Sequence, residues 1–531
     1  MKQIVFSCAL LVLNTTLCAS ENVADAYCKL GNAFLSEGNI GQAYKEYQRA
    51  LARNPQHTHA LLQLSTLYFQ HKKYQQASPF LERYTAQHPN DQEALIMLAH
   101  CYNAQKRAPE AQKVYTTVLA LNPQRIDLYF YRAQCINQQH QHTQALEDIE
   151  RFLARFPEDI PALKLKAKIL AQIGHYTAAL ELLEQLPASH STAATCAHIY
   201  KTIGDTTHAI ERYAQALSEQ PHNRTYQLGL SYSHLLAGDF ERGYELMKTY
   251  VITPENQNGL LEDISNISGK RIFIGAEIML DSMIKHIRFA KKIKEHGGIT
   301  VVHTPEPLVE IFSDCPFIDE VISTTEQTIP ACDFHIPAIL LPWLFKEYTS
   351  DAVPYLTARD THTATWHARL ARNGHRSIGI CWHQHDQHIP AAERPSIATE
   401  ELNQLFSLQE YNFYALYQKN QIPSLQALEN TLQLITLCGA GFSEQPTDMS
   451  MLLALLDSLD IIITIDHSIA HLAGALGKET YVLLPYHATW HWGTEGTTST
   501  WYPTITLVRQ KEPGSWQEAI AEIMERLKSP T

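Results

Sequence analysis

Small and large apolar residues recur with a fixed step of 34 positions along the first half of the chain. Four prolines keep this spacing, and four alanines keep it twelve residues ahead of them: Pro55, Pro89, Pro123 and Pro157, with Ala43, Ala77, Ala111 and Ala145. Small residues let two helices cross closely, large ones fill the space between them, and proline ends a helix because it has no backbone N–H. The pattern therefore predicts a series of helical hairpins.

A repeat of this length and composition resembles the tetratricopeptide repeat. The residues that carry the pattern in the first unit are Leu30, Gly31, Phe34, Ala43, Tyr47, Ala50 and Pro55. Less regular units follow, so we expect residues 24–250 to form an all-α superhelix of about seven repeats. The fifth unit must be shorter, because Pro221 lies 64 residues after Pro157 and two full repeats would need 68.

The stacked hairpins of such a superhelix leave a concave groove. Recognition of a protein or peptide partner there, and a role as a spacer or oligomerisation arm, both remain open. Nothing at the groove positions specifies a ligand. Cys101 and Cys135 occupy the same position in successive repeats, so packing explains both thiols.

Short β-branched runs alternate with amphipathic helices from Arg271 onward. The predicted strands are 271–274, 299–302, 377–382, 413–417, 460–465 and 481–484, and the predicted helices are 283–295, 449–459 and 468–476. This alternation predicts parallel sheets covered on both faces. We therefore expect a linker at 251–269, an N-terminal Rossmann-like lobe at 270–360 and a C-terminal, nucleotide-binding Rossmann-like lobe at 373–531.

The most informative motif follows the predicted strand that ends near Ile465. Asp466 and His467 stand between this strand and a helix that begins at Ser468. Free backbone N–H groups at residues 467–470 would bind an anion, and the helix dipole would favour it. Ser468 is expected to cap the helix or bond a phosphate oxygen, and His471, one turn on, to add a donor. The alternative is that Asp466 only caps the helix and His471 only packs.

Two further motifs are candidates for the same site. Trp382 is followed by a histidine-rich stretch at 383–388 and then by Arg394, a fixed cation suited to a diphosphate. The histidines come without a carboxylate at ligand geometry, so a solvated polar loop is expected and no metal site. The aromatic residues of 490–492 and 501–503 either stack on a base or sugar or seal the interface between lobes.

Composition narrows the class of protein. The chain has 531 residues, of which 45% are hydrophobic and 18% charged, so it is a globular protein of several domains. Its formal net charge of -13 argues against a nucleic-acid partner held by a basic surface. Ten cysteines without a CxxC pair do not indicate a disulfide scaffold.

The N-terminal segment at 1–20 has the order of a secretory signal: a lysine, an apolar run from Ile4 to Leu13, and small residues ending at Ser20. The run is too short to span a bilayer core of roughly 30 Å, and no stable transmembrane segment is expected. The protein is expected to be exported if the signal is cleaved and cytoplasmic otherwise. A buried N-terminal helix is the alternative for this segment.

The segment from Asp460 to Leu484, together with 490–492 and 499–503, resembles the C-terminal domain of glycosyltransferase family 9, the heptosyltransferase-like proteins. The resemblance extends over 271–342 and so covers nearly all of residues 270–531. It implies a GT-B fold and transfer of a sugar from a nucleotide-diphosphate sugar to an acceptor hydroxyl, without metal or other cofactor. The donor site would use the helix start at 466–471, with Arg394 and Trp382 at its rim.

The sequence departs from this family at two places. The glycine-rich turn after the first strand, whose aspartate is the family's presumed base, is replaced by residues 279–282, which leaves Asp281 and Ser282 as the catalytic candidates. His467 stands where Thr or Ser is frequent, and His491 where Arg is frequent. Two hypotheses therefore remain: an active glycosyltransferase whose repeats position an acceptor or partner, and a catalytically impaired GT-B module in a protein-interaction scaffold.

Overall fold

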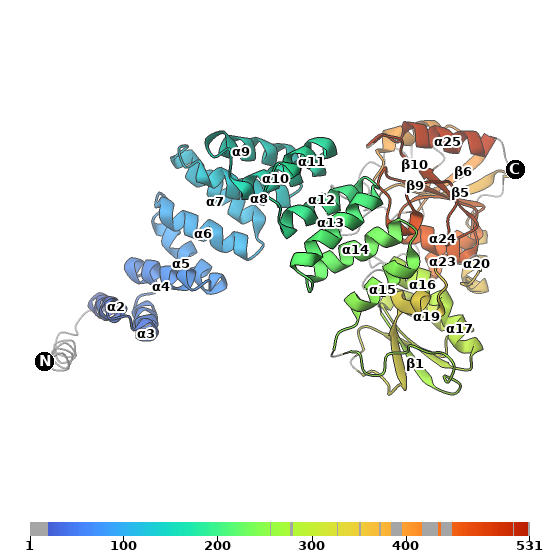
Figure 1. Cartoon of the computed structure of the whole chain (residues 1–531), viewed down its shortest axis with the longest axis horizontal. Coiled ribbons are helices and arrows are strands. Elements are labelled where there is room, and N and C mark those ends of the chain that lie inside the picture. The colour runs from blue at the N-terminus through green and yellow to red at the C-terminus, as the bar shows by residue number, and fades with distance from the viewer. Residues whose placement is uncertain are drawn as a thin grey trace. The chain divides into compact units, whose positions relative to one another are not determined.

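The computed structural model describes residues 20–254, 256–276, 280–326, 328–349, 352–370, 373–383, 396–416, 434–436, 449–512 and 514–528. The predicted signal, apart from its last residue, lies outside these ranges, and so does Arg394. The chain forms two compact units, one up to Leu186 and one from Pro187 onward (Figure 1).

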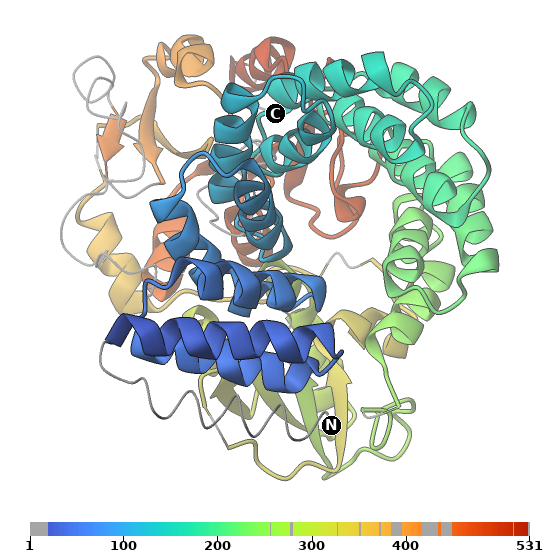
Figure 2. The same ribbon diagram turned by 90° about the vertical axis from the view of Figure 1, so that its left-hand side faces the viewer.

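The first unit consists of helices that pair into antiparallel hairpins, and Figure 2 shows the earliest pairs in blue. The helices are α2 (Ser20–Ser36), α3 (Ile40–Arg53), α4 (Thr58–Gln70), α5 (Tyr74–Gln87), α6 (Gln92–Ala104), α7 (Ala108–Leu121), α8 (Asp127–Gln138), α9 (His142–Arg155), α10 (Ile160–Gln172) and α11 (Tyr176–Glu184). Each of the four regularly spaced prolines lies two residues beyond the end of a helix. The predicted helical hairpins are confirmed.

Side-chain size explains the close packing within the hairpins. The four alanines of the 34-residue register are fully buried, as are Cys101 and Cys135. A Cβ atom added at Gly31 would lie 2.7 Å from the Tyr47 ring, so only glycine lets these two helices approach as they do. Helix α11 has 9 residues where α9 has 14, and the predicted shortening of the fifth unit therefore falls in its second helix.

The second unit begins with two more hairpins, α12 (His190–Thr202) with α13 (Thr206–Glu219) and α14 (Arg224–Leu236) with α15 (Phe240–Val251). The last hairpin shares one hydrophobic core with the α/β part that follows, through Leu235, Tyr244 and Met247. In addition, the indole N–H of Trp343 donates to the Glu245 carboxylate at 2.7 Å. This hairpin is therefore packed onto helices of the α/β part as well as onto its neighbouring repeat.

The first lobe contains, within the described residues, a parallel sheet of four strands in the order β3-β2-β1-β4. The strands are β1 (Arg271–Gly275), β2 (Ile299–Thr304), β3 (Glu320–Ser323) and β4 (Phe334–Pro337). The other elements are α16 (Leu280–His286), η1 (Ile287–Phe289), α17 (Ala290–Glu295), α18 (Glu306–Ser313), η2 (Ala338–Leu340) and α19 (Leu341–Phe345). The helix predicted at 283–295 is thus divided by a 3-10 segment.

The second lobe contains a parallel sheet whose described strands are ordered β10-β9-β8-β5-β6-β7. The strands are β5 (Arg376–Cys381), β6 (Tyr411–Ala415), β7 (Leu434–Thr436), β8 (Ile461–Ile465), β9 (Thr480–Leu484) and β10 (Ile505–Arg509). The helices are η4 (Thr399–Leu402), α21 (Asn403–Phe406), α23 (Met449–Ser458), α24 (Ser468–Leu476), η5 (Trp490–Trp492) and α25 (Gln517–Lys528), and α20 (Asp360–His367) precedes the sheet. Strands β8 and β9 are buried along their whole length, as expected for parallel strands covered on both faces.

The order of the second sheet reverses beside its first strand. From β5 the chain builds β6 and β7 on one side, and then returns to place β8 on the other side. In open α/β sheets this point is where the carboxyl ends of the strands leave a crevice. Helices α16 and α24, one from each lobe, contact each other between the two sheets (Figure 1).

The structure confirms the predicted architecture at this level: all-α repeats followed by an α/β part with parallel sheets. The predicted strands begin and end within two residues of the observed ones. Over the described part of the chain, no helix has both the length and the apolar character needed to cross a membrane.

Candidate functional site

The site lies at the topological switch point of the second lobe. Strand β8 ends at Ile465 and helix α24 begins at Ser468, so Asp466 stands at the carboxyl end of a central strand. The hydroxyl of Thr489 donates to Asp466 Oδ2 at 2.8 Å. The side chain of Asp466 is only 11% exposed, so its carboxylate is held in a largely enclosed position.

His471 lies one turn into α24 and is fully buried. Its Nδ1 atom is 3.0 Å from the hydroxyl of Tyr502, which is also fully buried. Its Nε2 atom has no hydrogen-bond partner among the residues that the structure describes. An unsatisfied polar atom in such a position is costly, so it requires an explanation.

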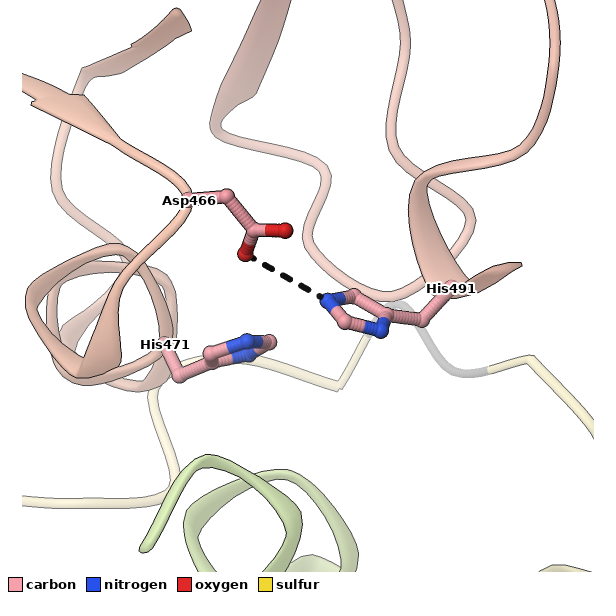
Figure 3. A group of neighbouring side chains, drawn as sticks. All are labelled: Asp466, His471 and His491. Carbon is pink, nitrogen blue, oxygen red and sulfur yellow. Dashed lines mark ion pairs between the residues drawn. The ribbon is translucent and has the colours of Figure 1, made fainter. Parts of the chain in front are cut away.

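His491 approaches from the 3-10 segment η5, which follows β9 and precedes β10. Its Nε2 atom lies 3.7 Å from Asp466 Oδ1 and 3.2 Å from Thr489 Oγ1. Figure 3 shows His491, from η5, converging on Asp466 and His471, which both belong to the turn from β8 into α24. One nitrogen or oxygen atom of each lies within 4.8 Å of those of the other two.

The first lobe places basic side chains against this cluster. Lys285 in α16 is 4% exposed, and its Nζ atom lies 4.1 Å from the centre of the Trp490 ring and 4.9 Å from that of Trp501. Aromatic faces stabilise a desolvated ammonium group. The Lys285 charge is close enough to the cluster to lower the pKa of both His471 and His491.

Arg288 connects the two lobes. Its guanidinium donates to the Trp501 carbonyl at 2.8 Å and to the Tyr355 hydroxyl at 3.1 Å, and Nε donates to the Lys285 carbonyl at 3.0 Å. The guanidinium also lies 4.3 Å from the centre of the Tyr355 ring and 4.7 Å from that of Tyr502. The Arg288 side chain therefore holds the two lobes together.

A third histidine, His286, is fully buried beside this junction. Its Nδ1 atom is 3.2 Å from the Ser282 hydroxyl, and its Nε2 atom is 3.4 Å from the hydroxyl of Tyr244 in the last repeat hairpin. Its ring meets Trp501 edge to face at 5.7 Å. The last repeat and both lobes thus converge here.

Burial sets the protonation of the cluster. It lowers the pKa of His491 to about 4, with help from the Lys285 charge, and it lowers the pKa of His471 and His286 well below the usual range. Burial alone would raise the pKa of the Asp466 carboxyl, but the imidazole of His491 holds that pKa below its ordinary value. At neutral pH the arrangement is therefore a carboxylate beside neutral imidazoles and a lysine.

The predicted start of α24 is only partly available to an anion. The imidazole of His467 accepts the amide N–H of Ile469 at 3.4 Å, and the His467 carbonyl accepts that of Ala470 at 2.8 Å. The Ser468 hydroxyl lies 3.2 Å from His467 Nδ1. His467, and neither Asp466 nor Ser468, is thus the N-cap, and two of the four amides expected to be free are engaged.

The other predicted residues have different environments. Trp382 is 1% exposed, packs edge to face on Phe406 and donates to Thr399 at 3.3 Å, so it belongs to the core of the second lobe and not to a rim. Asp281 and Ser282 lie in the first turn of α16, partly buried. Arg394 lies outside the described residues.

Sequence reasoning placed Asp466 and His471 in one site and named His491 only as a departure from the resembling family. It missed Lys285 and Arg288. The position of Lys285 and Arg288 in the sequence could have identified them. Both lie in the segment 283–290, which is entirely buried and whose other residues are mostly apolar. A basic residue inside an otherwise apolar segment indicates a buried charge with a specific task.

Two family models match the chain, and both describe helical repeats. A model described as the N-terminal ARM repeat of tetratricopeptide repeat protein 21 matches residues 40–180, and a tetratricopeptide-repeat model matches residues 197–256. Neither of these extends into the two sheets. No curated protein matches the chain.

Several solved repeat proteins are similar to part of the chain. A tetratricopeptide repeat protein from Parabacteroides merdae is 17% identical, with a TM-score of 0.37, over 44% of this chain and 94% of that one. The pilF protein of Pseudomonas aeruginosa is 20% identical, with a TM-score of 0.30, over 39% and 96%. YrrB, described as a TPR protein with an unusual peptide-binding site, is 17% identical, with a TM-score of 0.28, over 34% and 95%. From the family models and its own helices, the chain is a tetratricopeptide-repeat protein in its N-terminal half, continued by an α/β part.

Proposed function

We propose that the chain joins a partner-binding repeat region to a glycosyltransferase-like module of the GT-B type. In this proposal the two lobes bind a nucleotide-diphosphate sugar and transfer the sugar to an acceptor hydroxyl. The repeats bind a protein or peptide, either as a partner or as the carrier of the acceptor. No cofactor is required.

One observation carries this proposal: Asp466 and the start of α24 lie at the switch point of the second sheet, and the first lobe brings Lys285 to the same place. A departing diphosphate needs positive charge and hydrogen-bond donors where its own charge develops. Lys285 supplies the charge, the dipole of α24 adds partial positive charge, and the Ser468 hydroxyl supplies a hydrogen-bond donor. Asp281, in the first turn of α16, is the candidate base for the acceptor.

A second candidate function is nucleotide binding without sugar transfer, within a protein-interaction scaffold. Ser282 favours this candidate, since it stands where the resembling family carries its presumed base. The capping of α24 by its own His467 weakens the phosphate site in both candidates, because the imidazole occupies an amide that a phosphate would otherwise bind.

Nucleotide binding is tested on the full chain by thermal unfolding with UDP, ADP, GDP or CDP. The seven tryptophans all lie at or beyond position 343, so their fluorescence reports on the second unit alone. A nucleotide present at 100 times its Kd stabilises the unit that binds it by about 2.7 kcal/mol. We expect one of the four nucleotides to do so, and Lys285→Met to abolish the effect.

The matched control is Lys291→Met, which removes an exposed lysine from the adjoining helix α17 and should leave binding unchanged. If none of the nucleotides shifts the unfolding of the second unit, both candidates are wrong. If one binds, hydrolysis of the matching nucleotide sugar separates them. Turnover that is lost in Asp281→Asn supports the transferase, and binding without turnover supports the scaffold.

A further inference from the structure

We infer that Asp466, His471 and His491 form a binding site for a divalent transition-metal ion of the zinc type. Two imidazoles and one carboxylate are a ligand set that suits Zn²⁺ and related ions, and three protein ligands leave a position open for a further ligand. The inference departs from the metal-free expectation, and it does not depend on the proposed sugar transfer.

His471 has an orphaned ring nitrogen. Its Nε2 atom is buried and has no hydrogen-bond partner in the described part of the chain, while its Nδ1 atom is engaged by the Tyr502 hydroxyl at 3.0 Å. Histidines that bind metals nearly always use one nitrogen for the ion and the other for a hydrogen bond that orients the ring. The Tyr502 hydroxyl does this for His471, and a cation at Nε2 would remove the cost of burying that atom unsatisfied.

The three side chains also converge. The candidate ligand atoms lie within 4.8 Å of one another and come from two segments of one lobe, as Figure 3 shows. Ligand atoms around a tetrahedral zinc ion lie roughly 3.4 Å apart, so a pair at the 4.8 Å limit has to close by roughly 1.4 Å. Asp466 and His491, already 3.7 Å apart, need little movement. The Thr489 hydroxyl, 2.8 Å from Asp466 Oδ2, orients that carboxylate as an outer partner.

The charge of a neighbouring lysine gives the site a distinguishing test. Lys285 opposes a dication, because its ammonium group is buried against the Trp490 and Trp501 rings beside the cluster. The same lysine would favour an anion. Removing its charge therefore shifts metal affinity and phosphate affinity in opposite directions.

The test is Zn²⁺ binding to the full chain after chelator treatment, measured by titration against a competing chromogenic chelator. We expect one tight Zn²⁺ per chain, its loss in Asp466→Asn and in His491→Gln, and a 10- to 100-fold weaker affinity in Tyr502→Phe. Mg²⁺ should not compete, because imidazole ligands do not suit it. The matched control is His487→Gln, which removes a nearby histidine outside the cluster and should leave the tight site intact.

Two further measurements do not depend on variants of the ligands. Co²⁺ in place of Zn²⁺ should give the visible absorption bands of a low-coordinate site in the wild-type chain. Lys285→Met should bind Zn²⁺ several-fold more tightly. Absence of the Co²⁺ bands, a tight site that survives both Asp466→Asn and His491→Gln, or weaker Zn²⁺ binding by Lys285→Met would overturn the inference.

Discussion

Replacement of Arg288 by methionine should destabilise the second unit without unfolding the first. The guanidinium is 6% exposed and donates to the Trp501 carbonyl in the second lobe, to the Tyr355 hydroxyl and to the Lys285 carbonyl. Each buried acceptor left unsatisfied costs about 1 to 3 kcal/mol, and loss of the contacts with two tyrosine rings adds about 1 to 2 kcal/mol. Relief of the cost of burying a charge offsets part of this sum. We therefore expect a net loss of about 3 kcal/mol.

The assay is urea unfolding of the full chain followed by tryptophan fluorescence, because every tryptophan lies in the second unit. Arg288→Lys should lose nearly as much stability, since an ammonium group cannot reach three acceptors in the geometry of a planar fork. Arg369→Met is the control: this arginine is exposed, and its guanidinium lies 5.2 Å from the centre of the Trp366 ring. An Arg288→Met chain within about 0.5 kcal/mol of wild type, the usual range for surface substitutions, would refute the idea of an interlobe clamp.

Three further outcomes are expected. Ala77→Leu should destabilise the first unit by about 1 to 3 kcal/mol through overpacking, measured by far-UV circular dichroism, whereas leucine at the exposed neighbour Gln75 should not. Gly229→Ala should destabilise the second unit by a similar amount, because its Cβ would lie 2.3 Å from the Tyr213 ring; unchanged tryptophan-monitored unfolding would contradict this. Burial lowers the pKa of His487 to about 4, so its contribution to stability is present above pH 6.5 and is lost as the pH falls toward 4. Between pH 7 and pH 4, the free energy of unfolding should therefore fall by up to about 3 kcal/mol less in His487→Gln than in the wild type, as measured by urea unfolding.

The repeats were predictable from the sequence because their determinants are local and periodic. The position of each proline fixes the end of a helix within two residues, and the alanine register identifies where helices cross. Strands β5, β6, β8 and β9 of the second lobe were predictable for a related reason, whereas β7 and β10 were not predicted. Parallel strands buried on both faces, such as β8, are continuous apolar runs that a single segment reveals.

The candidate site was only half predictable. Asp466 and His471 belong to one strand-to-helix turn, so a short segment identifies both. Lys285 and Arg288 come from the other lobe, and their proximity to Trp490 and Trp501 depends on how the lobes pack, which no local pattern encodes. The capping role of His467 was missed because serine and aspartate are the more common caps.

The shared core of the last helical hairpin has a consequence for the ancestry of this chain. The 34-residue pattern ends near residue 251, before the first strand. If two genes had been joined to make this chain, that position would be the expected junction. A cut there would expose the apolar surfaces around Leu235, Tyr244 and Met247 on one piece and their counterparts on the other. Exchange of repeat arrays between relatives should therefore occur upstream of Pro187, with the last two hairpins inherited together with the sheets.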